Sequence, residues 1–123
     1  MKKQPHILVI DDDQFYLDHA KFELKGHATY QLFQGPNDFE ERVKKEDIDK
    51  ADLVIVDYDF GTGTAIKSQI SRFIRDDLGY AKELVLCSLH ETFGDHEDRV
   101  KLDYDHVLQK KDLNWGKISS ILT

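Results

Sequence analysis

The sequence has 123 residues, a length that fits one domain with a single hydrophobic core and leaves little room for a second catalytic or DNA-binding module. Its 17 Lys and Arg against 24 Asp and Glu give a net charge of −7, which repels nucleic-acid phosphates and argues against direct DNA binding. No apolar run approaches the roughly 18 residues of a membrane span, and no export signal precedes the first predicted strand near His6. We therefore expect a single soluble domain over 1–123, cytoplasmic, with no membrane or nucleic-acid partner.

Short apolar runs alternate with amphipathic stretches along the chain, which is the pattern of βα units that stack into a parallel sheet. Three runs, 7–10, 53–56 and 84–87, are continuously hydrophobic, as strands covered by helices on both faces should be. Two runs of more mixed polarity, 29–33 and 106–108, are typical of sheet edges. The pattern predicts five strands in total.

The segments between these strands are predicted to be helices, because their apolar residues recur with helical periodicity. Leu17, Ala20 and Leu24 share one face of a first helix, after which Gly26 is placed for a left-handed C-terminal cap. The residues that support the later helices are Pro36, Phe39 and Val43 for the second; Ile66, Ile70, Phe73 and Ile74 for the third; 95–101 for a weakly apolar fourth; and Asp112 as the cap of a last helix that carries Trp115, Ile118 and Leu122.

Polar side chains follow four of the five predicted strands. The carboxyl ends of parallel strands share one edge of the sheet, and ligands bind there. Crowded carboxylates repel one another, and a hard divalent cation with a preference for oxygen ligands holds them ionised together, so Mg²⁺ is predicted. A hydroxyl and an ammonium opposite the metal are donors that phosphoryl transfer needs. The residues concerned are Asp11, Asp12 and Asp13 after the first strand, Asp57 and Asp59 after the third, Ser88 after the fourth and Lys110 after the fifth.

The segments HILVIDDD, DLVIVDYD, LVLCS and VLQKK resemble the four signature segments of bacterial two-component receiver domains, in the right order and over essentially the whole chain. The resemblance implies an α/β, flavodoxin-like, doubly wound fold with five helices. Its five-stranded parallel sheet would have the strand order 2-1-3-4-5.

The resemblance also implies a role for each polar residue at the sheet edge. Asp57 would accept the phosphoryl group, and Asp11 would position the metal through water. The remaining implied contacts are Asp12, Asp57 and the backbone carbonyl of Asp59 to Mg²⁺, and Ser88 and Lys110 to the phosphoryl oxygens.

The partners implied by the resemblance are proteins. The phosphoryl donor would be a sensor histidine kinase or a histidine phosphotransfer protein of a phosphorelay, and the phosphorylated form would change its affinity for a downstream protein that the sequence does not identify. The face of the fourth helix, fifth strand and fifth helix would be the surface for a homodimer. The chain would not be an enzyme beyond self-phosphorylation from the donor and slow autodephosphorylation.

The sequence departs from the family pattern at several positions. The loop 60–64 reads FGTGT where receivers carry Met-Pro and Asp-Gly, and Val107 stands where an aromatic switch residue is common. Leu89 stands where a small residue is common, which predicts slow labelling and slow hydrolysis. Lys111 replaces a proline whose peptide is cis in the family, and because a cis non-proline bond costs about 3–4 kcal/mol we predict a trans Lys110–Lys111 peptide.

Two other functions stay open. Asp57-Tyr58-Asp59 resembles the nucleophile and acid pair of haloacid-dehalogenase-type phosphatases, but Gly61 stands where those enzymes have Thr or Val and no acidic pair follows Lys110. A pseudo-receiver, which binds proteins without being phosphorylated, would fit the altered loops and is opposed by the retained key residues. Plainer interpretations also exist, since an acidic triplet after a strand is often a helix cap and a strand-end Ser or Lys is often solvated surface.

Overall fold

The computed structural model of the chain describes residues 4–57, 70–88 and 104–122. The strands in this part of the chain are, in order, β1 (His6–Ile10), β2 (Thr29–Phe33), β3 (Leu53–Asp57), β4 (Glu83–Ser88) and β5 (His106–Gln109). They form one parallel sheet in the order β2-β1-β3-β4-β5, which confirms the predicted topology. The predicted strands each agree with the observed ones to within a residue at either end.

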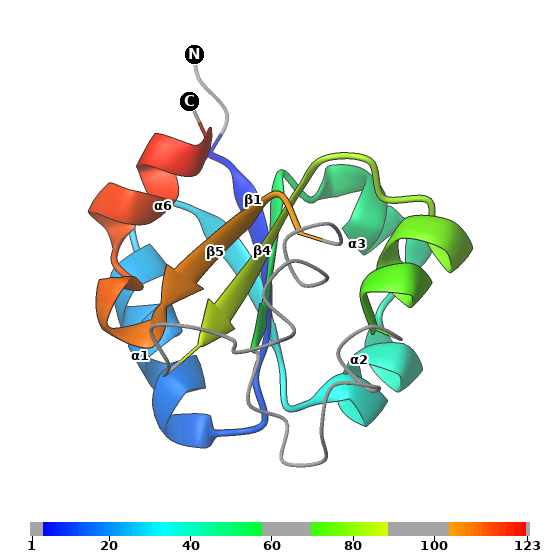
Figure 1. Ribbon diagram of the computed structural model, residues 1–123, viewed down its shortest axis with the longest axis horizontal. Helices are drawn as coiled ribbons and strands as arrows, with labels where there is room; N and C mark the ends of the chain where they lie inside the picture. The colour runs from blue at the N-terminus through cyan, green and yellow to red at the C-terminus, as the bar shows by residue number, and fades with distance from the viewer. Residues whose placement is uncertain (1–3, 58–69, 89–103, 123) are drawn as a thin grey trace, which may run out of the picture.

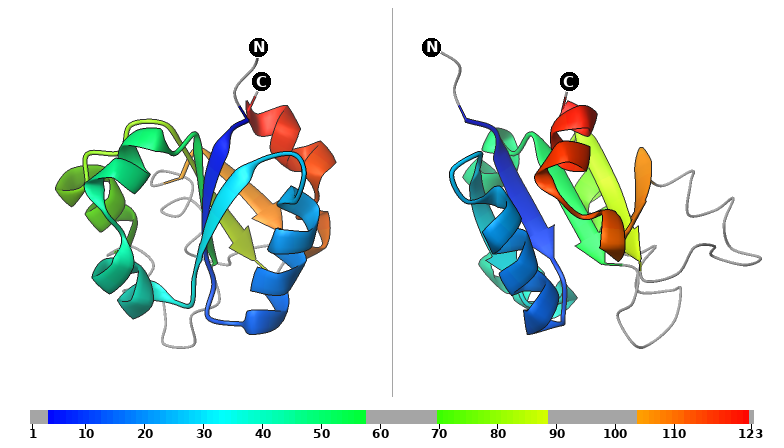
Figure 2. Two further views of the ribbon diagram at one scale, coloured as in Figure 1. Left: turned by 180° about the vertical axis from the view of Figure 1, so that it is seen from behind. Right: turned by 90° about the vertical axis from the view of Figure 1, so that its left-hand side faces the viewer.

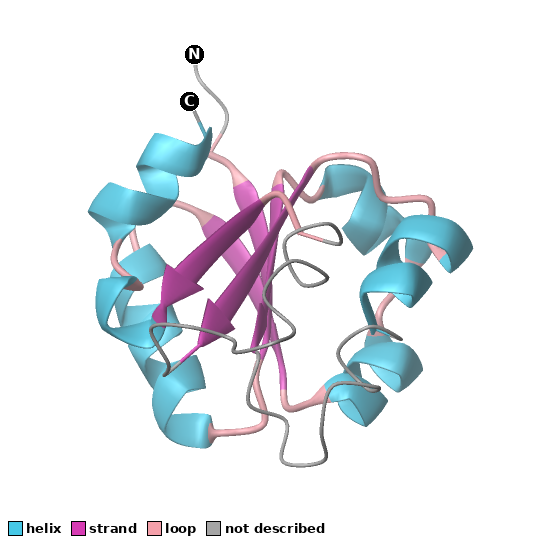
Figure 3. Cartoon of the chain, in the orientation of Figure 1, coloured by secondary structure: helices cyan, strands magenta, loops and turns pink. Residues whose placement is uncertain are grey.

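Helices cover both faces of the sheet. Figure 1 shows α1 and α6 on one side of the strands and α2 and α3 on the other, and the views in Figure 2 show the same layers from behind and from the side. Figure 3 separates helices from strands by colour and makes the layering plain. The helical segments are α1 (Gln14–Leu24), α2 (Pro36–Arg42), α3 (Lys45–Lys50), a π-helical turn η1 (Phe73–Asp77), a 3₁₀ turn η3 (Lys110–Asp112) and α6 (Trp115–Leu122).

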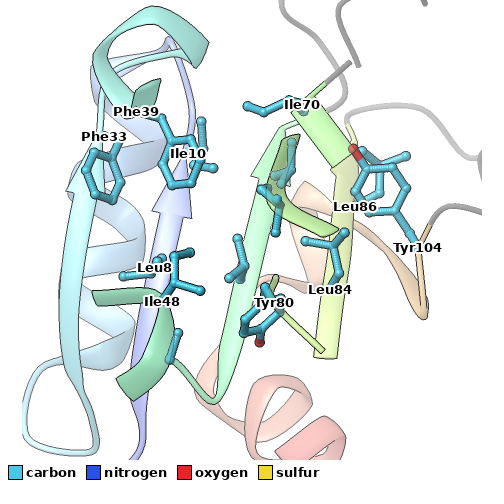
Figure 4. Close-up of a cluster of buried hydrophobic side chains, with 14 residues drawn as sticks. Leu8, Ile10, Phe33, Phe39, Ile48, Ile70, Tyr80, Leu84, Leu86 and Tyr104 are labelled. Atoms are coloured by element: carbon cyan, nitrogen blue, oxygen red, sulfur yellow. The ribbon is translucent and has the colours of Figure 1, made fainter. Parts of the chain in front are cut away.

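Alternate residues of the buried strands point into two separate cores. Leu8 and Ile10 of β1 pack toward α2, α3 and η1, whereas Ile7 and Val9 pack toward α1 and α6. Figure 4 shows the first core, where Phe33 meets the ring of Phe39 edge to face at 5.0 Å. This burial on both faces explains why the central strands are continuously hydrophobic in sequence.

The first helix agrees closely with the sequence prediction. Leu17, Ala20 and Leu24 are its buried residues, and they form the side of α1 that packs on the sheet. Gly26 has φ +86°, the left-handed conformation expected just after the helix. Its position allows the chain to turn directly into β2.

The second predicted helix is two short helices. α2 ends at Arg42, the next residue, Val43, is extended, and α3 begins after Lys44. The Asp47 carboxylate accepts the N–H of Lys44 at 3.0 Å and so caps the new helix. The break lets both Phe39 and Ile48 reach the same core.

The prediction that Asp112 caps the last helix is wrong. Asp112 lies in η3, which turns the chain so that Leu113 is buried, and α6 begins only at Trp115. The cap is Asn114, whose Oδ1 accepts the N–H of Lys117 at 2.9 Å. The predicted apolar side of this helix is confirmed, since Ile118 is fully buried and Trp115 packs against the same core.

The third predicted helix is described only in part. Residues 70–72 are helical and continue into η1, and Ile70 and Ile74 are buried as predicted. Ile66 and the fourth predicted helix, 95–101, lie outside the described residues. No helix in the described ranges is long and apolar enough to cross a membrane.

Candidate functional site

Three carboxylates meet at the carboxyl edge of the sheet, as predicted. β1 and β3 are neighbours with Ile10 opposite Val56, so Asp11 and Asp57 follow in adjacent positions. Carboxylate oxygens of Asp11, Asp12 and Asp57 all lie within 4.8 Å of one another. Asp57 and Asp11 are buried, at 1% and 5% exposed, whereas Asp12 is exposed to solvent.

The loop after β1 holds Asp11 from both sides. Its backbone N–H donates to the carbonyl of Phe33 at 3.1 Å, and its Oδ1 accepts the N–H of Asp13 at 2.9 Å. Asp13 itself caps α1, because its Oδ1 accepts the N–H of Phe15 at 3.0 Å. The plain interpretation of the acidic triplet as a helix cap is therefore right for Asp13, while Asp11 and Asp12 belong to the carboxylate cluster.

Lys110 enters this cluster from the end of β5. Its Nζ lies 2.9 Å from Asp57 Oδ1 and 3.1 Å from Asp11 Oδ2, and the residue is only 4% exposed. The Lys110–Lys111 peptide is trans, as predicted, and η3 continues the chain in place of a cis turn. The interpretation of Lys110 as solvated surface is wrong, because the ammonium is buried between two carboxylates.

Burial and charge oppose each other in setting the pKa values of the site. Burial raises the pKa of the Asp11 carboxyl, and the N–H of Asp13 and the Lys110 ammonium offset only part of this effect. Burial alone would lower the pKa of Lys110, but its hydrogen bonds and ion pairs with Asp57 and Asp11 outweigh burial and raise it. Lys110 is thus held protonated at neutral pH.

The donor set fits a hard divalent cation. Three carboxylates face one ammonium, so the cluster carries excess negative charge, and its ligand atoms are oxygens. The exposed Asp12 places one of them on the solvent side, where a hydrated ion can enter. Gly35 lies against this residue with φ +94°, and a Cβ there would stand 3.6 Å from the Asp12 Cβ.

Ser88 ends β4 beside the acidic strand ends. Asp57 pairs in register with Cys87, so the fully buried Ser88 is one residue further along the neighbouring strand. Cys87 is buried among apolar residues, as is typical of a structural thiol. Asp59, the loop 60–64 and Leu89 lie outside the described residues, so their predicted roles stay predictions.

The likeness to known proteins is one of structure. No protein-family model and no curated protein sequence matches the chain. A response regulator of Burkholderia pseudomallei, solved with a phosphorylated aspartic acid, a calcium ion and citrate, is 18% identical with a TM-score of 0.70 over 98% of this chain and 67% of that one. The BeF3-activated receiver domain of DrrB from Thermotoga maritima is 16% identical, with a TM-score of 0.71 over 98% of each chain. A receiver domain of Clostridium thermocellum is 20% identical, with a TM-score of 0.69 over 96% of this chain and 90% of that one.

The chain has the response-regulator receiver fold. This fold brings the predicted residues Asp11, Asp12, Asp57 and Lys110 together and places Ser88 on the adjacent strand end. Val107 is half-buried and packs against the core on the α2 and α3 side.

Sequence reasoning missed one neighbour of the site. The ring of Tyr16 in α1 lies 3.8 Å from Lys110 Nζ, measured to the ring centroid. An aromatic residue five positions after Asp11 was visible in the sequence. Its contact with a lysine 94 positions away (110 − 16 = 94) depends on the packing of α1 beside the end of β5.

Proposed function

We propose that the chain is a phosphoacceptor receiver domain of two-component signal transduction, with Asp57 as the acceptor. The observation that carries the proposal is the buried Asp57 carboxylate, held 2.9 Å from the Lys110 ammonium within a cluster of three carboxylates. A buried carboxylate in fixed geometry is a nucleophile aimed at one position, and charged partners around it can balance an incoming phosphoryl group.

In the proposed reaction an oxygen of Asp57 attacks the phosphorus of a phosphohistidine donor. The new P–O bond forms as the P–N bond breaks, and the electron pair stays on the imidazole nitrogen. Lys110 pairs with a phosphoryl oxygen, and the Ser88 hydroxyl donates a hydrogen bond to another. Asp12, Asp57 and the backbone carbonyl of Asp59 would hold Mg²⁺, with Asp11 positioning it through water, and the ion would supply positive charge that offsets the repulsion between the carboxylates and the phosphoryl group.

The proposed partners follow from this chemistry. A sensor histidine kinase or a histidine phosphotransfer protein supplies the phosphoryl group, and a downstream protein reads the phosphorylated form. The face proposed for a homodimer consists of the fourth helix, the fifth strand and the fifth helix. Of these elements, the structure describes β5 and α6. The chain catalyses nothing beyond its own phosphorylation and slow dephosphorylation.

The experiment is incubation of the purified chain with Mg²⁺ and acetyl phosphate, followed by intact-mass measurement. A stable adduct of about 80 Da that disappears in Asp57→Asn supports the proposal. Asp49→Asn is the matched control, because Asp49 is an exposed carboxylate on α3 whose partner is Lys45, and it should label like the wild type.

The same experiment distinguishes the alternatives. Rapid turnover of phosphate esters without a lasting adduct would support a haloacid-dehalogenase-type phosphatase. No adduct under any Mg²⁺ concentration would support a pseudo-receiver and overturn the proposal.

A further inference from the structure

The Lys110 ammonium is enclosed on three sides. Asp57 Oδ1 and Asp11 Oδ2 accept from it at 2.9 and 3.1 Å, and the face of the Tyr16 ring covers it at 3.8 Å. A cation over an aromatic face is attracted by the ring quadrupole, most strongly where water is excluded. With the lysine only 4% exposed, the ring is a true contact partner of a desolvated charge.

The ring is held in place by a row of contacts along one face of α1. Tyr16, His19 and Glu23 are spaced three and four residues apart, so they lie on the same face of the helix. His19 Nε2 donates to the carbonyl of Leu113 at 2.8 Å, and Glu23 Oε1 accepts the backbone N–H of Trp115 at 3.1 Å. We call these three residues the α1 contact row.

The contact row ties α1 to the segment that carries the lysine. Each member touches a residue between Lys110 and Trp115, in matching chain order. Trp115 is also stacked on His27, with ring centroids 4.8 Å apart and planes 11° apart. The segment after β5 is therefore anchored along its length to one helix and the turn that follows it.

Lysine needs such an anchor more than most residues do. Its ammonium is a compact charge on a flexible four-carbon stem, which can reach many positions. A carboxylate in place of the Tyr16 ring would also hold the Lys110 ammonium. It would, however, add negative charge at the position that a phosphoryl dianion must approach. The Tyr16 ring attracts the ammonium without a net charge of its own.

We infer that Tyr16 is a positioning residue for phosphoryl transfer, which holds the Lys110 ammonium on the Asp57 side of the site. This inference rests on the proposed function. Tyr16 does not touch the acceptor carboxylate in the proposed role and acts only through Lys110. Its aromatic face, rather than its hydroxyl, performs this role, so phenylalanine should replace it.

The test compares Tyr16→Phe with Tyr16→Leu in the rate of Mg²⁺-dependent labelling by acetyl phosphate. Tyr16→Phe should stay within about two-fold of wild type, and Tyr16→Leu should be slower by about five-fold, equivalent to about 1 kcal/mol. Phe22→Leu is the matched control, because Phe22 is another aromatic residue of α1 and is 77% exposed, so its loss should leave the rate unchanged.

Two further measurements separate positioning from a structural role. In a Lys110→Ala background, Tyr16→Leu should cause no additional loss of labelling rate, whereas damage to the fold would slow labelling in both backgrounds. In NMR spectra the ring current should shift the Lys110 ε-methylene protons upfield in wild type and Tyr16→Phe, and this shift should vanish in Tyr16→Leu. The second measurement needs no folded Lys110 variant.

The outcomes separate a failure of the proposed function from a failure of the role assigned to Tyr16. A wild-type chain that does not label at Asp57 overturns the proposed function and this inference with it. Normal labelling in Tyr16→Leu, an equal loss in Tyr16→Phe, or an unshifted lysine signal in wild type overturns the inference alone.

Discussion

Among single residues, the three carboxylates of the site differ in burial, and burial separates their part in folding from the metal binding proposed for them. Asp11 and Asp57 are buried and share the Lys110 ammonium, so the folded state depends on their pairing. Removing the cation from such a group leaves uncompensated buried charge, which costs about 3–5 kcal/mol. Asp12 is exposed and adds negative charge to the same cluster without an ion pair to Lys110.

Asp12→Asn should therefore abolish Mg²⁺-dependent labelling while leaving the metal-free protein at least as stable as the wild type. The amide removes a proposed metal ligand and also relieves repulsion with Asp11 and Asp57. Labelling by acetyl phosphate and urea unfolding with EDTA measure the two effects. A clearly destabilised Asp12→Asn protein that labels at the normal rate would contradict the role of Asp12.

The buried hydroxyl of Tyr80 should make the free energy of unfolding fall at alkaline pH. Burial raises the pKa of its hydroxyl, which donates to the carbonyl of Glu83 at 2.7 Å. Above a pH of about 10 the unfolded chain loses this proton while the folded chain keeps it, so the folded state binds more protons and stability falls as pH rises.

Tyr80→Phe should make that fall shallower between about pH 10 and 11, although the lost hydrogen bond lowers stability by about 1 kcal/mol at neutral pH. Urea unfolding at a series of pH values measures the slope. Equal slopes for wild type and Tyr80→Phe would contradict the prediction.

At the scale of elements, helix ends decide where the segments around the site begin. Asp13 caps α1 directly after the two cluster carboxylates, and Asn114 caps α6 shortly after Lys110. Both caps use short polar side chains that accept backbone N–H groups, and each sets the direction in which the chain leaves the site.

Asn114→Ala should lower the free energy of unfolding by about 1 kcal/mol, because the N–H of Lys117 loses its partner. Asp112→Ala is the matched control and should cost clearly less, since Asp112 lies in η3 and does not cap α6. Chemical unfolding of both variants decides the point. A larger loss in Asp112→Ala than in Asn114→Ala would restore the cap expected from the sequence pattern.

Over the whole molecule, stability comes from two apolar layers on either side of one sheet. Each central strand supplies both layers with alternate side chains, so the layers are joined through the strands. A domain of this size should unfold as one cooperative unit. The carboxylate cluster is then supported by both layers, because Asp57 ends the fully buried strand β3.

Leu86→Ala should cost about 2–5 kcal/mol, because Leu86 is fully buried in the layer beneath α2 and α3. Phe22→Ala should change stability by no more than about 0.5 kcal/mol, since Phe22 is 77% exposed on α1. Thermal or urea unfolding compares the two losses of apolar bulk. Similar destabilisation in both variants would show that Phe22 is covered in solution.

The sequence by itself determined the strands and most of the site. Runs such as 53–56 are hydrophobic because both faces of their strand are buried, and this property can be read locally. The carboxyl ends of parallel strands share one edge, which predicts that acidic strand ends and Lys110 meet, and Asp11, Asp12, Asp57 and Lys110 do.

Only the tertiary structure decided how each polar side chain is used. It assigned Asp13 to a helix cap and Asp11 to the ion pair, moved the α6 cap from Asp112 to Asn114, and placed Tyr16 over Lys110. These choices depend on which groups reach one another across packed elements, at distances of a few ångströms. The hydrophobic periodicity and the turn residues of a sequence do not predict these contacts, because the contacts depend on the angle at which a helix packs against the sheet.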